Sequence, residues 1–233
     1  MPQHIGIVAC SAEGAALCYR TICVEGAPLL GAHDHPEVSM HTHSLAEYMK
    51  CIYRGDWQGV GELMLSSANK LAKIGADFLI CPDNTLHQAL DLVREQAPAP
   101  WLHIAEEVGA SATTRGFKRL GILGTRYLME GPVYPSKLSA RSIAHEIPDA
   151  SDRERIHEII LDELVYGRLE EESRRFFQGV IQRLGRRGCD SVVLGCTEIP
   201  LLISEADSPL PAIDSTRTLA RAALREAMRT VRA

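Results

Sequence analysis

The sequence predicts an α/β protein made of two pseudo-symmetric, three-layer lobes with mostly parallel sheets. Short apolar runs alternate with longer helical segments throughout the 233 residues. Motifs of the first half also return in the second half at a nearly constant offset. The composition, 45% hydrophobic and 24% charged, is ordinary for a globular chain that folds unaided. Apolar strands separated by helices are typical of parallel sheets built from βαβ units.

The expected strands are the short apolar runs, and the first of them begins almost at the N-terminus. They cover Ile5–Ala9, Val38–His41, Phe78–Cys81, Trp101–Ile104, Leu120–Gly124 and Val192–Leu194. Apolar residues at helical spacing predict the helices between them. These cover Glu13–Cys23, Trp57–Ile74, Leu86–Glu95, Arg153–Val165, Glu170–Arg183 and Thr216–Val231. In parallel sheets of this kind ligands bind at the carboxyl ends of the strands, so functional residues are expected there.

Three segments of the first half recur in the second half. They pair Ile5–Ser11 with Leu120–Arg126, Ala76–Thr85 with Cys189–Glu198, and Pro100–Ile104 with Pro209–Ile213. In the second pair each segment follows a glycine, Gly75 or Gly188, that is expected to end a helix. The simplest explanation of the repeats is a duplicated lobe.

The duplication predicts the domain organisation. We expect one lobe from residues 1–98 and 212–233, and the other from residues 99–211. Two related lobes that face each other would form a cleft at the carboxyl ends of their strands, and we expect the active site in this cleft. The repeat places Asp83 and Cys196 at equivalent positions, one in each lobe.

Asp83 and Cys196 are the candidate catalytic residues. Each follows a predicted strand and precedes a helix, where free N–H groups and positive potential hold a carboxylate substrate and activate a thiol. Cys196 is therefore expected to be a base or a nucleophile, and the alternative is a small buried core residue. Asp83 is either an acid, base or substrate clamp in the cleft, or a helix N-cap.

Other polar residues at the same strand ends are candidates for substrate binding. The set is Ser11, Asn84, Thr85, Thr125, Thr197 and Glu198. Their hydroxyl, amide and backbone groups are suited to hold a substrate carboxylate. Glu198 has a second interpretation as a helix cap, because acidic residues are favourable in the first turn of a helix.

Several classes of ligand are not indicated by the sequence. His33, His35, His41 and His43 lie close together, but no carboxylate or cysteine stands at a matching spacing, so no metal site is expected. The chain has no Gly-x-Gly-x-x-Gly motif, no other phosphate loop and no lysine in a Schiff-base context, so no cofactor is expected. The formal net charge is −5 and no basic face is evident, which argues against nucleic acid as a partner.

The chain is expected to be cytoplasmic and away from membranes. No run of about 18 apolar residues predicts a transmembrane helix, and the N-terminus lacks the features of a signal peptide. Seven cysteines, an odd number without a Cys-x-x-Cys pair, favour free thiols in a reducing compartment.

Taken together, these motifs resemble the aspartate/glutamate racemase family. The strongest match is Val193–Leu202, which contains Cys196, and Cys81–His87 stands at the family's Cys-Asn-Thr-x-His site. Further matches are Asp34–Pro36, Pro100–Glu106, Gly124–Glu130, Glu163–Leu164 with Gly167, and Pro211–Asp214. The resemblance covers nearly the whole chain. It implies a two-lobed homodimer that acts on a small amino acid or related carboxylate without pyridoxal phosphate, with two cysteines flanking the substrate α-carbon.

The sequence departs from the family pattern at the first of these cysteines, where it has Asp83. An aspartate has an ordinary pKa near 3.9 against about 8.5 for a cysteine, so it is a weaker base unless burial raises that value. Three functions are compatible with this change. The first is a racemase or epimerase in which Cys196 and Asp83 act on opposite faces of the substrate. The second is a single-thiol isomerase or decarboxylase of a small carboxylic acid, and the third is a binding homologue without turnover.

Overall fold

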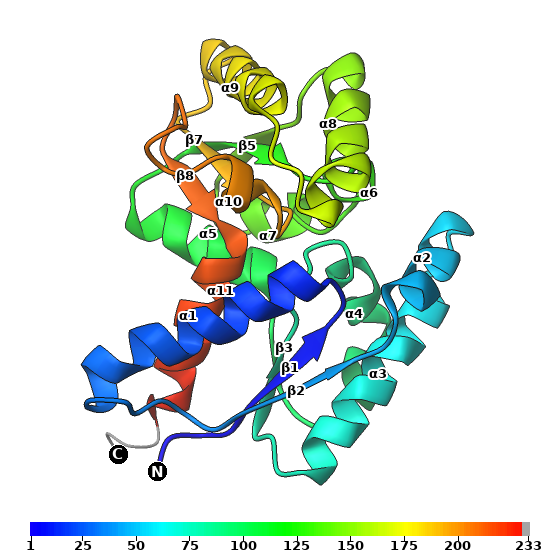
Figure 1. Ribbon diagram of the computed structural model, residues 1–233, viewed down its shortest axis with the longest axis vertical. Helices are drawn as coiled ribbons and strands as arrows, with labels where there is room; N and C mark the ends of the chain where they lie inside the picture. Colours follow the sequence, from blue (N-terminus) through cyan, green and yellow to red (C-terminus); the bar gives the residue numbers. More distant parts are fainter. Residues whose placement is uncertain (230–233) are drawn as a thin grey trace. The chain divides into compact units, whose positions relative to one another are not determined.

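The computed structural model describes residues 1–229, which fold into two compact units (Figure 1). Unit 1 contains Met1–Ile104 and the chain from Thr216 onward, and unit 2 contains Ala105–Ser215. The domain boundaries expected from the sequence, at 98/99 and 211/212, stay predictions. The last two positions of the expected helix Thr216–Val231 lie outside the described residues.

Unit 1 is built on a four-stranded parallel sheet with the strand order β2-β1-β3-β4. The strands are β1 (Ile5–Ala9), β2 (Val38–Thr42), β3 (Phe78–Ile80) and β4 (Trp101–Leu102). The helices are α1 (Ala12–Leu30), α2 (Leu45–Tyr53), α3 (Trp57–Lys73), α4 (His87–Val93) and α11 (Ser215–Ala227), with a 3-10 turn at Arg94–Gln96.

The sheet of unit 1 is covered on both faces, as its fully buried strands β1 and β3 require. On one face Ile5, Ile7 and Ile80 form a core cluster with side chains of α1 and α11. On the other face α3 packs so closely that a Cβ on Gly6 would lie 2.7 Å from Leu79 Cδ2 and 3.4 Å from Leu71 Cβ. The central strand can carry only a glycine at this point without a shift of its neighbours.

Unit 2 repeats this plan with a parallel sheet in the order β6-β5-β7-β8. The strands are β5 (Arg119–Leu123), β6 (Ala144–Glu146), β7 (Ser191–Leu194) and β8 (Ala212–Asp214). The helices are α5 (Ile104–Thr114), α6 (Arg126–Met129), α7 (Pro135–Ser139), α8 (Ala150–Asp162), α9 (Glu171–Arg186) and α10 (Ile199–Leu202), with a 3-10 turn at Leu164–Tyr166.

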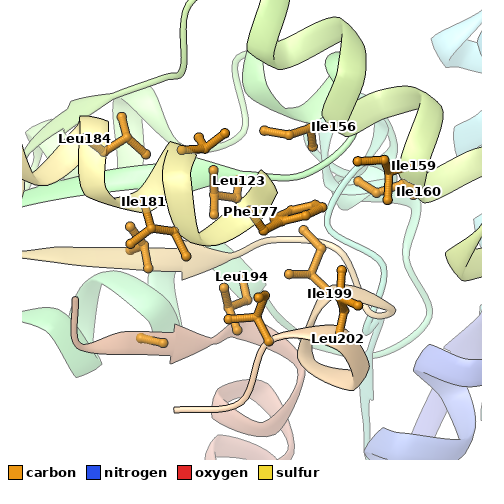
Figure 2. Close-up of a cluster of buried hydrophobic side chains, with 14 of the residues drawn as sticks. Leu123, Ile156, Ile159, Ile160, Phe177, Ile181, Leu184, Leu194, Ile199 and Leu202 are labelled. Atoms are coloured by element: carbon orange, nitrogen blue, oxygen red, sulfur yellow. The ribbon is translucent and has the colours of Figure 1, made fainter. Parts of the chain in front are cut away.

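Two separate hydrophobic cores cover the faces of this second sheet. Figure 2 shows the first, in which Phe177 of α9 packs with Ile160 of α8 and Ile199 of α10. The strands contribute alternate residues to the two faces: Val192 and Leu194 belong to this core, whereas Val193 joins α5 and α7 on the opposite face. The three-layer α/β architecture predicted from the sequence is therefore confirmed in each unit.

The duplication is confirmed at the level of strand register. Ile5 is paired with Phe78 in the first sheet, and their sequence counterparts Leu120 and Ser191 are paired in the second. The glycines Gly75 and Gly188, which stand before β3 and β7, have φ values of 98° and 90°. These lie in the left-handed region that favours glycine, so both helix ends use the same turn.

The third repeat is corrected by the backbone hydrogen bonds. The N–H of Leu79 donates to Pro100 O at 2.8 Å, and the N–H of its counterpart Val192 donates to Pro211 O at 3.0 Å. Pro100 therefore corresponds to Pro211. The sequence comparison had paired it with Pro209, and this prediction is wrong. Two prolines lie so close together that the sequence pattern alone does not choose between them.

The structure also adds elements and shortens one strand. Strand β6 was not predicted because its residues Ala144 and His145 are exposed, so the strand lacks an apolar run. The predicted strand Trp101–Ile104 was too long, since β4 ends at Leu102 and Ile104 begins α5. Within residues 1–229, none of the helices combines the length and the apolar character that a membrane span requires.

Candidate active site

The candidate residues lie directly after neighbouring strands within each unit. In unit 1, Ser11 follows β1 and the segment Asp83–Thr85 follows β3, which is paired with β1. In unit 2, Thr125 follows β5 and the segment Cys196–Glu198 follows β7, which is paired with β5. Because all these pairings are parallel, the residues gather at the carboxyl edge of their own sheet, where ligands bind in α/β folds.

Asp83 is held by the backbone of its own turn. Its Oδ1 accepts hydrogen bonds from the N–H groups of Thr85 at 3.0 Å and Leu86 at 3.4 Å. Helix α4 begins only at His87, so the aspartate caps the connecting turn and not the helix itself. Asn84 is buried in the same turn. The carboxylate therefore acts as a hydrogen-bond acceptor with a fixed orientation.

Cys196 is positioned by a close approach of two strand ends. Gly195, the first residue after β7, donates its N–H to Leu123 O at 2.7 Å, and this bond keeps the ends of β5 and β7 together. A Cβ on Gly195 would lie 2.6 Å from the same carbonyl oxygen, so only glycine fits there. The chain then turns, and Cys196 is half-buried at the carboxyl end of β7.

Glu198 is the hydrogen-bond partner of the candidate thiol. Its Oε2 accepts from Cys196 Sγ at 2.9 Å and from Thr197 Oγ1 at 2.7 Å. Both Thr197 and Glu198 are buried. Glu198 stands at the N-cap position of α10, as its second interpretation predicted, but its carboxylate makes no capping hydrogen bond to that helix. A carboxylate in this place can accept the proton of the thiol.

Ser11 and Thr125 begin the helices that follow the first strand of each unit. Ser11 Oγ accepts from the N–H of Gly14 at 3.3 Å, and Thr125 Oγ1 accepts from the N–H of Leu128 at 3.4 Å. Both side chains are half-buried. Their role as substrate ligands stays a prediction, and their capping bonds explain why a hydroxyl residue is favoured at each position.

Tyr48 is a residue of this region that the sequence did not indicate. It comes from α2, is fully buried, and lies within electrostatic range of Cys81, Cys10 and Asp83. Burial, together with Cys81, Cys10 and Asp83, raises the pKa of Tyr48 far above its ordinary value. Burial and the nearby Asp83 likewise raise the pKa of the Cys81 thiol. Tyr48 and Cys81 therefore both remain protonated.

Two of the four histidines near the N-terminus, His41 and His43, are bound to serine side chains of α3. Among residues 1–229, no three His, Cys, Asp or Glu side chains are arranged to hold a metal ion. His41 Nδ1 lies 2.9 Å from Ser67 Oγ, and His43 Nε2 lies 3.1 Å from Ser66 Oγ. His41 of β2 and the following His43 thus form polar contacts with α3.

Two repeated parallel sheets, with polar residues at their carboxyl edges and a thiol beside a carboxylate, define an α/β enzyme of duplicated architecture. The family model for Asp/Glu/Hydantoin racemase matches residues 7–223. The chain therefore belongs to this family and is an isomerase of the amino-acid racemase type.

Relatives of known structure cover almost the whole chain. A crystal structure from Yersinia pestis, provisionally described as an Asp/Glu racemase, has a TM-score of 0.89 and 31% identity, and covers 97% of this chain and 100% of that one. An aspartate racemase homologue of Pyrococcus horikoshii OT3 has a TM-score of 0.83 at 24% identity, with 97% and 99% coverage. The broad specificity amino-acid racemase RacX of Bacillus subtilis (strain 168) is 22% identical over 166 residues, 71% of each chain.

Proposed function

We propose that the protein racemises or epimerises a small amino acid without a cofactor. In this proposal Cys196 exchanges the α-proton on one face of the substrate and Asp83 exchanges it on the other. The observation that carries the proposal is the equivalence of the two residues, since Asp83 lies in the turn after β3 and Cys196 in the turn after β7, the corresponding strands of two sheets with the same order and register. Family membership supports the reaction type.

Glu198 gives Cys196 a way to change its protonation state. The thiol donates to Glu198 Oε2 at 2.9 Å, so a short transfer to the carboxylate produces the thiolate that removes an α-proton. In the opposite direction the protonated thiol delivers its proton to the carbanion. Thr197, which donates to the same oxygen, holds the carboxylate in place.

Asp83 would act as the proton carrier on the other face. Its Oδ1 accepts from the N–H groups of Thr85 and Leu86 in its own turn, which fixes the orientation of the carboxylate. The proposed substrate-binding residues are Ser11, Asn84, Thr85, Thr125 and Thr197. An amino-acid substrate is favoured because the related RacX is described as an amino-acid racemase of broad specificity.

Incubation of single enantiomers in D2O tests this function. A panel of small and acidic amino acids would be followed by ¹H NMR for loss of the α-proton and by chiral chromatography for the opposite enantiomer. We expect both signals for at least one amino acid and neither signal with Cys196→Ser. Absence of α-deuterium in every amino acid of the panel would contradict racemisation.

A one-thiol reaction is the second candidate, and the geometry of Asp83 favours it. A carboxylate that accepts two backbone N–H bonds is well placed to hold its turn, and does not need to move a proton. The enzyme would then be an isomerase or decarboxylase of a small carboxylic acid, with Cys196 as the sole proton carrier. Product analysis by NMR separates the two, because a decarboxylated or isomerised product replaces the mirror-image amino acid. A ligand-induced rise in Tm without any product would indicate a binding protein.

We also propose a cytoplasmic homodimer whose two lobes follow the boundaries expected from the sequence, residues 1–98 with 212–233 and residues 99–211. The free thiols of Cys23, Cys51, Cys81 and Cys189 support a reducing compartment. Light scattering coupled to size-exclusion chromatography tests the dimer, and a mass near twice the 25.6 kDa of one chain is expected.

A further inference from the structure

The peptide group between Leu194 and Gly195 lies where β7 ends, directly before the turn of Cys196, and hydrogen bonds hold it at both ends. Its N–H, which belongs to Gly195, donates to Leu123 O at 2.7 Å. Its carbonyl, which belongs to Leu194, accepts from Ser215 Oγ at 2.8 Å. One bond reaches the end of β5, and the other comes from the residue after β8. The plane of this peptide group is therefore fixed from both neighbouring strands.

Ser215 is the last residue of unit 2 and follows β8 directly. It is fully buried, so water does not compete for its hydroxyl. Its neighbour Asp214 is the register partner of Leu194 in the pairing of β7 with β8. The serine side chain therefore continues the tie between these two strands beyond their last paired residues.

Gly195 needs such support because of its own conformational freedom. A glycine reaches more backbone conformations than a residue with a Cβ. A larger residue cannot replace it, since a Cβ here would lie 2.6 Å from Leu123 O. The direction in which the chain leaves β7 must therefore be set by contacts of the peptide group. Cys196 follows directly, and its Sγ lies 2.9 Å from Glu198 Oε2.

The corresponding carbonyl of unit 1 is also held by a buried side chain. Cys81 stands two residues before Asp83, as Leu194 stands two residues before Cys196. Cys81 O lies 2.9 Å from Nε2 of the buried His87. A carbonyl oxygen only accepts, so this ring nitrogen carries the proton. Because the serine and the histidine come from different places in the chain, the shared feature is the held carbonyl and not a copied residue.

We propose that Ser215 is a positioning residue for Cys196. By holding Leu194 O it fixes the peptide group before the turn, and this keeps the thiol in place beside Glu198 for proton exchange. In this role Ser215 acts through the backbone and transfers no proton. The inference rests on the proposed function, in which Cys196 carries the α-proton.

Steady-state kinetics separate this role from substrate binding. In Ser215→Ala one of the two bonds that fix the peptide group is lost, and a misplaced thiol slows proton transfer more than binding. We expect kcat for racemisation to fall by about 10-fold while KM changes by less than about 2-fold. Ser215→Thr keeps a hydroxyl and should recover most of the lost rate. Ser215→Cys, whose thiol is a weaker donor, should lie between the two, and it replaces Ser215→Ala if that variant does not fold.

Ser191 provides a matched control at the opposite end of β7. It is also fully buried, and its Oγ donates to Pro211 O at 2.8 Å. Ser191→Ala therefore removes the same type of bond from the strand that precedes Cys196. Ser191→Ala and Ser215→Ala should lower the urea midpoint to a similar extent, but only Ser215→Ala should lower kcat. Equal losses of kcat in the two variants would overturn the proposal and indicate a general loosening of β7.

Tyr134 is a second group that Ser215 affects. Burial raises the pKa of this tyrosine, and a hydrogen bond with Ser215 opposes the rise. Tyr134→Phe removes the phenol hydroxyl and leaves the bond from Ser215 Oγ to Leu194 O, so it should retain the wild-type kcat. A loss in Tyr134→Phe as large as that in Ser215→Ala would overturn the proposal, because Ser215 would then act through the phenol.

Alkylation of Cys196 tests the proposal even if the wild-type chain converts no amino acid, a result that would count against the proposed function alone. Iodoacetamide reacts with the thiolate, and peptide mass spectrometry reports Cys196 separately from the other cysteines. A thiol that donates to a carboxylate is held in its protonated form. We therefore expect half-maximal alkylation at a lower pH in Ser215→Ala, and at the wild-type pH in Ser191→Ala. A wild-type profile in Ser215→Ala would overturn the proposal regardless of activity.

Discussion

The turns after β3 and β7 occupy equivalent places in two duplicated sheets but hold their key side chains in different ways. Asp83 is fixed by backbone N–H groups of its own turn. Cys196 is bound to a buried side-chain carboxylate, Glu198. The counterpart of Glu198 in the first unit is Thr85, whose backbone N–H donates to Asp83. Duplication therefore preserves the position of the candidate catalytic residue, while the groups that bind this residue differ between the two units.

The residues at the strand ends next to the two turns also differ between the units. The second unit has Gly124 and Gly195 where the first has Ala9 and Pro82. In the second unit the strand ends approach so closely that a Cβ on Gly195 would lie 2.6 Å from Leu123 O. The thiol turn is thus tied to its sheet by backbone contact, whereas the aspartate turn leaves room for larger residues.

Loss of the thiol should have the largest effect. In Cys196→Ser the hydroxyl is a far weaker acid than the thiol, so we expect the rate of racemisation to fall by about 10³-fold or more. Chiral chromatography of initial rates measures the loss. Cys51→Ser, which alters a thiol of α2 outside the strand ends, is the control and should keep its activity. A Cys196→Ser enzyme with wild-type rates would refute the role of the β7 turn.

Replacement of the carboxylate beside the thiol should have the next largest effect. Glu198→Gln retains the size of the side chain but cannot take up the thiol proton, so we expect kcat to fall by about 10²-fold. Thr85→Ala, at the equivalent position of the first unit, keeps the N–H that holds Asp83 and should change kcat much less. Similar losses of kcat in Glu198→Gln and Thr85→Ala would show that Glu198 has no special role in proton exchange at Cys196.

The tight backbone of the β7 turn predicts a loss of stability. In Gly195→Ala the new methyl group meets a backbone carbonyl that cannot move freely, and we expect the free energy of unfolding to fall by about 1–3 kcal/mol. In Gly124→Ala the nearest atom is Leu128 Cδ2 at 2.7 Å, the end of a flexible side chain, so the loss should be smaller. Urea unfolding measures both, and the reverse order would contradict the packing seen at Gly195.

Acid should weaken the second unit through His157 of α8. Burial, and then the charge of Arg126, lowers the pKa of His157 below its ordinary value of 6.5. Unfolding therefore takes up a proton, and stability that is present above about pH 6.5 is lost as the pH falls through this value toward the folded-state pKa. Urea unfolding at pH 7.5 and 5.5 should show a smaller loss for His157→Gln than for the wild type. An equal loss would exclude this histidine as a cause.

The sequence predicted the sheets and the two strand-end turns because both leave local signals. The strands are short apolar runs, and the matched segments that contain Asp83 and Cys196 are long enough to fix their alignment. Strand β6 was missed because it is exposed, and Pro211 was misaligned because Pro209 competes with it. Tyr48 could not be found from the sequence, since its place beside Asp83 depends on the packing of α2, which no periodic pattern marks.

The comparison of the two turns is tested most directly by Asp83→Cys. Initial rates of α-deuterium incorporation in D2O would be measured from each enantiomer of the best substrate, for this variant and the wild type. Because an aspartate and a cysteine differ by about 4–5 units in ordinary pKa, we expect unequal rates for the two enantiomers in the wild type. A second thiol should bring their ratio closer to one. An unchanged ratio in Asp83→Cys would show that Asp83 only holds its turn and that Cys196 alone moves the proton.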